Sequence, residues 1–184
     1  MIDQLTEFDP AFISVTYHQP QVVYEERDSV IYRIPKRKKP GTVGICAAVT
    51  NRYKIDTVPH FILGGFNKFE TEDALIDLHF LGMKNILALT GDYSGKGFGG
   101  KGTPVFDIDS VLLIRMLRGL GEKIIASGDP EPFFTGCAVS PFKSREAEWI
   151  AQYKKLEMKI DNGASFVITQ LGFDVRKFNE LIRY

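Results

Sequence analysis

The chain has 184 residues, 44% of them hydrophobic, so it can bury one sizeable core and fits the size of a single domain. Its 23 basic and 23 acidic residues balance, which excludes a global field favouring nucleic acid or an anionic membrane. No run reaches the roughly 18 apolar residues of a membrane span, and no signal peptide is visible at the N-terminus, so we expect a cytoplasmic protein without membrane or nucleic-acid partners.

Apolar runs of strand length alternate with longer segments of helical period along the chain. The runs are nearly continuous, as in strands that are covered on both faces. In chain order, the pattern predicts a strand at 12–17, a helix at 41–53, a strand at 58–63, a helix at 70–81, a strand at 85–89, a helix at 107–118, a strand at 133–139, a helix at 144–162, a strand at 165–170 and a helix at 174–181.

The helix boundaries rest on capping residues. Asp107, Ser144 and Asp174 are the predicted N-caps, and Gly82, Gly119 and Gly163 are the predicted stops. Only 41–53 is ambiguous from its residues, because its many β-branched side chains also suit a strand.

This alternation predicts parallel strands joined by right-handed crossovers. Two architectures remain open, a doubly wound sheet and part of an (α/β)₈ barrel, since a complete barrel normally needs about 250 residues. In both, ligands bind at the carboxyl ends of the strands. Function is therefore to be sought at those ends.

Polar residues stand at or near the predicted strand ends. They are Thr16, His60, the turn Thr90-Gly91-Asp92 and Gln170. Together they could orient a heteroaromatic ligand through paired donors and acceptors. Each also has a structural interpretation: Asp92 as a turn former, and His60 as a hydrogen-bonded core histidine. Gln170 is the more specific signal, because a buried amide in an apolar run must be hydrogen-bonded.

Other motifs in the sequence say less about function. The glycine-rich segment 95–101 fits phosphate-loop patterns, but the next helix begins only near residue 107, so we interpret it as a loop over the site. The basic run 36–39 is expected to be a solvated loop. Cys46 and Cys137 have no metal-ligand spacing and are expected to be reduced core thiols, and no metal site is predicted.

With these strand ends identified, the sequence resembles the methylenetetrahydrofolate reductase family, which are flavin-dependent (α/β)₈-barrel enzymes. The resemblance rests on five stretches in the family's order, at 12–17, 58–60, 82–92, 159–164 and 168–174. It implies a partial (α/β)₈ TIM-barrel fold of about five strands, with residues 1–184 forming one domain from the middle of the barrel. It also implies a helix at 41–53.

The resemblance implies site roles residue by residue. Residues implied to contact FAD are Thr16, His60, Thr90, Gly91, Asp92 and Lys159. Asp92 is the implied catalytic residue, near the flavin's pyrimidine edge and the folate, and Gln170 is implied to contact the pterin. The implied reaction uses NAD(P)H to reduce FAD, which then reduces 5,10-methylenetetrahydrofolate to 5-methyltetrahydrofolate, a step of one-carbon metabolism.

The sequence departs from the family's pattern in three places. The family's first strand, with its acid Glu, has no counterpart before Phe12, and its last two strands have none after Tyr184. Thr90 stands where the family usually has Arg, and the segment 140–146 differs, so that Lys143 or Arg145 would have to supply charge near the diphosphate. The alternatives are a flavin-free folate-binding or methyl-transfer module and a truncated inactive remnant. A homo-oligomer or a partner subunit is expected to cover the open strand edges.

Overall fold

The structure is a computed structural model that describes residues 2–17, 21–36, 40–91 and 107–184. Five parallel strands form one sheet in the order β1-β4-β5-β6-β7. They are β1 Phe12–Val15, β4 Asp56–Ile62, β5 Asn85–Leu89, β6 Phe134–Val139 and β7 Phe166–Thr169. The predicted strands and their parallel arrangement are confirmed. The sheet is a half-barrel, so the partial (α/β)₈ fold is confirmed as well.

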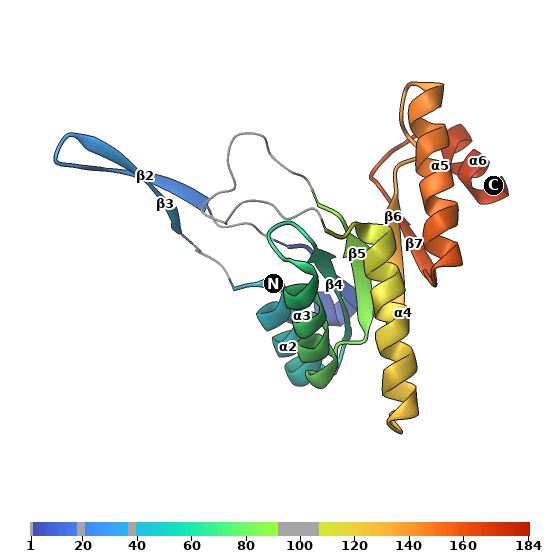
Figure 1. Ribbon diagram of the computed structural model, residues 1–184, viewed down its shortest axis with the longest axis horizontal. Coiled ribbons are helices and arrows are strands. Elements are labelled where there is room, and N and C mark those ends of the chain that lie inside the picture. The colour runs from blue at the N-terminus through green and yellow to red at the C-terminus, as the bar shows by residue number, and fades with distance from the viewer. Residues whose placement is uncertain (1, 18–20, 37–39, 92–106) are drawn as a thin grey trace.

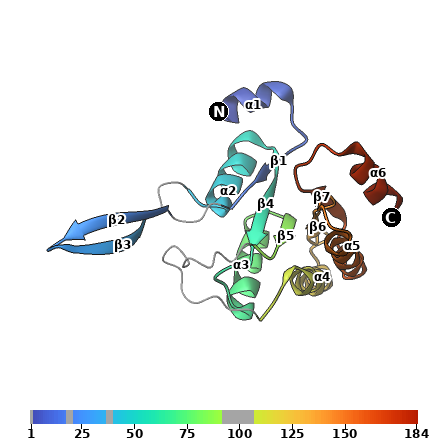
Figure 2. The ribbon, with the colours of Figure 1, turned by 90° about the horizontal axis from the view of Figure 1, so that it is seen from above.

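Four helices pack along one side of this sheet (Figure 2). They are α2 Thr42–Tyr53, α3 Lys68–Phe80, α4 Ser110–Ala126 and α5 Glu146–Asp161. The short helix α1 Ile2–Leu5, followed by the 3₁₀ turn η1 Thr6–Phe8, and the last helix α6 Val175–Arg183 lie toward the two ends of the sheet. Segment 41–53 is therefore helical apart from Gly41, its N-cap.

Four predicted helix boundaries were wrong. Helix α3 begins earlier than predicted, because Asn67 and Glu70 form a capping box. The N-cap of α4 is Asp109 instead of Asp107, whose carboxylate accepts a hydrogen bond from the backbone N–H of Lys68 at 2.8 Å. Helix α4 also continues through Gly119 to Ala126, because its apolar face continues. The N-cap of α5 is Arg145, so Ser144 does not cap it.

The core lies between the four helices and the sheet. Its fully buried members include Leu75, Ile86, Leu113, Ile114 and Leu117. Both cysteines are free and buried there, as predicted, and burial raises the pKa of the Cys46 thiol to about 11. No helix in the described residues is long and apolar enough to cross a membrane.

A hairpin that the sequence analysis did not predict follows β1. Strands β2 Gln21–Arg27 and β3 Val30–Lys36 pair antiparallel and project away from the sheet (Figure 1). Asp28 and Ser29 join them, with φ values of 51° and 60°. Two consecutive positive φ values are the mark of a type I′ turn, whose twist matches that of paired strands. The missed signal was the pair of β-branched and aromatic runs on either side of Asp-Ser.

Candidate functional site

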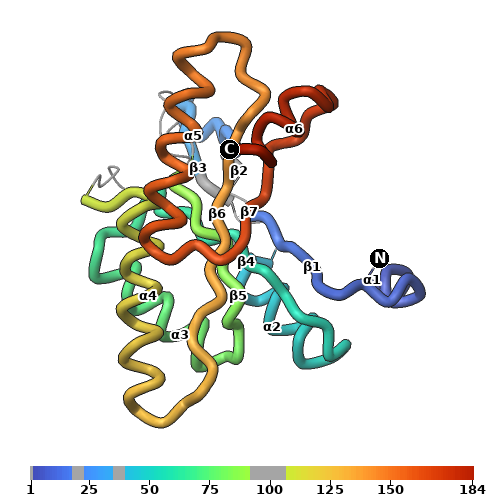
Figure 3. The backbone as a smooth tube through the Cα atoms, turned by 90° about the vertical axis from the view of Figure 1, so that its right-hand side faces the viewer, coloured from blue at the N-terminus to red at the C-terminus, as the bar shows by residue number. Residues whose placement is uncertain are grey.

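The two faces of the five-stranded sheet differ. Side chains alternate along each strand, so residues such as Val15, Phe61 and Cys137 point into the helix-covered core. We call the opposite side the open face. No described helix lies across it between α1 and α6 (Figures 2 and 3). The register of the strands places the following residues on the open face: Ser14, His60, Leu87, Gly136 and Phe166.

His60 lies half-buried on the open face, at the fifth residue of β4. Its Nε2 atom forms a 2.7 Å hydrogen bond with Oγ of Ser14 on the neighbouring strand β1. Burial lowers the pKa of His60 below its ordinary value, so the ring is neutral at pH 7. His60 is thus hydrogen-bonded, as the structural interpretation expected, yet it borders the open face instead of the core.

Thr16 follows β1, two residues after Ser14. Its backbone carbonyl accepts a 3.2 Å hydrogen bond from the hydroxyl of Thr42, the first residue of α2. This contact fixes the carboxyl end of β1, while the side chain of Thr16 remains exposed. Thr16 is therefore free to meet a ligand close to His60.

The turn after β5 is held from two sides. The Thr90 hydroxyl accepts a 3.1 Å hydrogen bond from the backbone N–H of Ser110, so Thr90 braces the start of α4. Gly91 has φ 87°, and a Cβ on it would overlap the Cγ2 methyl of Ile62. Only glycine fits there. The next residue, Asp92, was the predicted catalytic residue and lies outside the described residues, as does the glycine-rich segment 95–101.

A charged cluster stands behind this turn, where α4 and α5 meet. Nζ of Lys155 lies 3.0 Å from Oδ2 of Asp109, and Asp109 accepts backbone N–H bonds from Val111 and Leu112. Burial acts to raise the pKa of Asp109, but these N–H groups and Lys155 together hold it below its ordinary value. Sequence reasoning missed this cluster, because residues 46 positions apart share no local pattern.

Lys159 extends from α5 toward the sheet and is buried. Its Nζ donates a 2.7 Å hydrogen bond to the backbone carbonyl of Ala138 in β6. Burial lowers its pKa, mainly because the charged amine loses solvation. The structure therefore does not bring Lys159 together with Thr16 and His60 on the open face.

Gln170 continues β7, because its backbone N–H donates to Val139 O at 2.8 Å. Its side chain is exposed instead of buried, which removes the argument that its amide must be paired within the protein. It lines a cavity of about 590 Å³ together with Phe142, Gly172 and Phe173. This cavity opens at the carboxyl end of β7, where the sequence analysis expected ligand binding.

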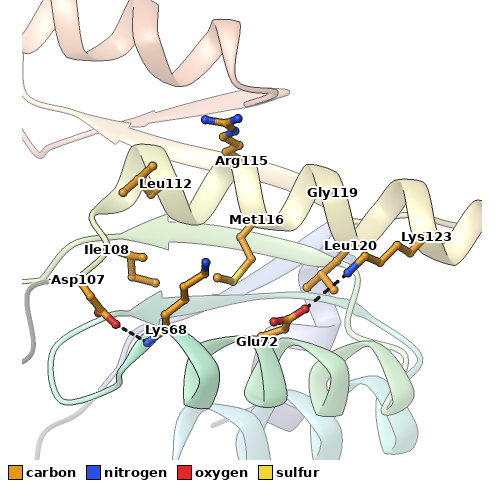
Figure 4. Close-up of a pocket in the computed structure, with 10 residues that line it drawn as sticks. All are labelled: Lys68, Glu72, Asp107, Ile108, Leu112, Arg115, Met116, Gly119, Leu120 and Lys123. Atoms are coloured by element: carbon orange, nitrogen blue, oxygen red, sulfur yellow. Dashed lines mark hydrogen bonds and ion pairs between the residues drawn. The ribbon is translucent and has the colours of Figure 1, made fainter.

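A second groove of about 520 Å³ lies between α3 and α4, on the helical side (Figure 4). Its charges come from Lys68, Glu72, Asp107, Arg115 and Lys123. Two of them pair across the groove, with Nζ of Lys123 3.8 Å from Oε1 of Glu72. None of the predicted site residues lines it. In the described part of the chain, no three His, Cys, Asp or Glu side chains gather as a metal site would require.

The fold and the position of its polar groups indicate the class of this protein. A half-barrel of parallel strands, with polar groups at their carboxyl ends, places it among the (α/β)₈-barrel proteins, which bind ligands at that edge. The model of the methylenetetrahydrofolate reductase family matches residues 1–184, so the chain belongs to that family.

Individual relatives agree with this assignment. The chain is 27% identical over 183 residues to a probable methylenetetrahydrofolate reductase (NADPH) of Caenorhabditis elegans. The matched region covers 99% of this chain and 24% of the relative. It is 29% identical to the 5,10-methylenetetrahydrofolate reductase of Pectobacterium carotovorum and 26% identical to that of Escherichia coli, each covering 96% of this chain. It spans 49% and 50% of their lengths.

Proposed function

We propose that this chain provides the flavin- and folate-binding part of an FAD-dependent enzyme that reduces 5,10-methylenetetrahydrofolate to 5-methyltetrahydrofolate with NAD(P)H. The observation that carries the proposal is the carboxyl edge of the half-barrel. There, Thr16 follows β1, His60 lies in β4 and Gly91 comes two residues after β5, and these three strands are neighbours in the sheet of a chain of this family. The proposal includes a place in one-carbon metabolism and a cytoplasmic location.

The described residues fit a flavin in part. Thr16 and the half-buried His60 offer hydrogen-bonding groups on the open face, and Gly91 has no side chain to block it. Lys159 would have to leave Ala138 to reach a ligand there. A bound flavin would supply the hydride-transfer chemistry. His60, as a neutral ring, would orient the flavin without adding charge.

Two side chains would position the folate. We propose that Asp92 lies beside the pyrimidine edge of the flavin and the pterin, where its negative charge opposes charge on a reduced flavin. Gln170, at the cavity that follows β7, would pair its amide with the pterin's donors and acceptors. These roles rest on the family pattern and on the position of Gln170 at the carboxyl edge.

We also propose that residues 1–184 act as one domain and that a second copy or a partner subunit covers β1 and β7. Each of these strands has a described neighbour on one side only. An exposed strand edge favours pairing with another chain.

Titration of the purified chain with FAD tests the flavin proposal. Binding should quench flavin fluorescence. His60→Ala should weaken FAD binding about tenfold, which corresponds to about 1.4 kcal/mol. His79→Gln is the matched control, because His79 contacts Glu131 and Phe133 away from the open face. A chain that neither carries nor takes up FAD would contradict the proposal.

A second candidate is a folate-binding or methyl-transfer module without flavin. The observation in its favour is that Thr90 and Lys159 are both engaged within the protein, by Ser110 and Ala138. Titration with methyltetrahydrofolate separates the two candidates. The module is supported if the chain binds methyltetrahydrofolate but not FAD, and if Gln170→Ala weakens that binding. The control Gln4→Ala, at an exposed position in α1, should leave the binding unchanged. Binding of neither ligand would support an inactive remnant.

A further inference from the structure

Ser14 has no role in the proposed function so far, yet it makes the closest side-chain contact to His60. The two residues lie on adjacent parallel strands, and Ser14 pairs in register with Val58, two positions before His60. Both side chains therefore project from the open face. Their hydrogen bond, 2.7 Å from Oγ to Nε2, joins residues 46 positions apart.

This contact uses one of the two ring nitrogens of His60. A serine hydroxyl can donate to an unprotonated nitrogen or accept from a protonated one, so it can match either tautomer of a neutral imidazole. In either tautomer the hydrogen bond fixes the orientation of the ring, and with it the position of the other nitrogen. Among the described residues, Ser14 is the hydrogen-bond partner of the His60 side chain and engages Nε2. This leaves Nδ1 for a ligand.

We propose that Ser14 is a positioning residue, which holds the ring of His60 in one orientation so that Nδ1 keeps a fixed position toward the ligand. The ligand part of this proposal rests on the proposed function. The ligand class is a planar heteroaromatic ring with a carbonyl beside an N–H, because such an edge pairs with a ring nitrogen of either kind.

Ser14 is exposed, so its replacement leaves the core intact. The key variant is Ser14→Ala, which removes the hydroxyl. Ser14→Thr keeps a hydroxyl at the same position and suits a strand. Ser165→Ala is the matched control, because Ser165 is exposed beside β7 and is bonded through its backbone N–H to Thr135 O at 2.7 Å.

The first measurement needs no ligand. Three-bond couplings across the Cα–Cβ bond of His60, measured by nuclear magnetic resonance on the full chain, report the rotamer of its ring. We expect one dominant rotamer in the unmodified chain, in Ser14→Thr and in Ser165→Ala, and averaging over several rotamers in Ser14→Ala. A Ser14→Ala chain with the same single rotamer would overturn the proposal.

The second measurement is FAD affinity. Loss of one orienting hydrogen bond should weaken binding about five- to tenfold in Ser14→Ala, while Ser14→Thr and Ser165→Ala stay within about twofold. Unchanged affinity in Ser14→Ala would overturn the positioning role. If no form of the chain binds FAD, the proposed function fails, and the rotamer measurement still decides whether Ser14 positions His60.

Discussion

The two faces of the five-stranded sheet carry the same kind of backbone but different environments. On the covered face, Ile86, Ala88 and Cys137 are fully buried beneath helices. On the open face, Phe134 remains 51% exposed, and Ser14 and Thr16 are exposed too. Alternate residues of the strands thus divide between the packed core and the open face, where Ser14 and Phe134 are exposed while Val58 and Leu87 are buried.

This difference separates stability from function. Substitutions on the covered face should cost folding free energy, because packed neighbours cannot fill the space. Substitutions on the open face should alter binding more than folding.

Leu113→Ala should lower the free energy of unfolding by about 3 kcal/mol, since Leu113 is fully buried in the core of α4. Leu112→Ala is the matched control on the same helix, where the side chain is 44% exposed, and it should cost less than about 1 kcal/mol. Urea denaturation measures both. Equal losses would contradict the assignment of the covered face.

Gly91→Ala should cost about 2 kcal/mol of unfolding free energy. Alanine must adopt φ near 87° and its Cβ would meet Ile62. Gly82→Ala shares the positive φ, 78°, but has open space around it, so it should cost about 1 kcal/mol. The excess at Gly91, measured by the same denaturation, isolates the steric conflict at the site. Equal losses of unfolding free energy in Gly91→Ala and Gly82→Ala would show that the turn after β5 can move.

Phe134→Ala on the open face should cost about 1 kcal/mol, mainly from the lost stacking on Phe166, whose ring centroid lies 5.2 Å away. Phe80→Ala, at an 89% exposed position on α3, should have almost no effect. A loss of unfolding free energy at Phe134 as large as that at Leu113 would contradict the difference between the two faces. It would mean that another chain covers the open face in solution.

His60 should give the smallest effect, a pH dependence of stability. Its folded pKa lies below the ordinary 6.5, because burial disfavours the charged ring. As the pH falls below about 6.5, the unfolded chain takes up a proton before the folded chain does, so the free energy of unfolding falls until the folded pKa is reached. Because the ring is only half-buried, the slope should stay well under about 1.4 kcal/mol per pH unit. His60→Gln should reduce the slope, and an unchanged slope would assign it to other groups.

Much of the half-barrel could be predicted from the sequence. The five apolar runs, the glycine stops at Gly82 and Gly163 and the acidic cap at Asp174 are local signals, and each depends on nearby residues alone. The start of α4 was wrong by a few residues because two aspartates, Asp107 and Asp109, competed for the N-cap. Which of them caps the helix depends on Lys68, which is distant in sequence.

The site was less accessible to sequence reasoning. The pairing of Ser14 with His60 depends on the register between β1 and β4, and no pattern within either strand encodes that register. The hydrogen bond from Lys159 in α5 to Ala138 in β6 depends on how the helix packs on the sheet, and the expected contact of Lys159 with a flavin stays a prediction. The structure leaves the roles of Thr16, Asp92 and Gln170 as predictions.

The hairpin also has a practical consequence. Its two ends, Gln21 and Lys36, are partners in the same ladder, so the chain leaves the body and returns at neighbouring points. The residues between these two ends can therefore be replaced as one unit. A shorter loop, a fluorescent label at Asp28-Ser29 or an inserted affinity tag could replace its tip without changing the distance that the connection must span. The region between β1 and α2 is thus the natural place to attach a probe.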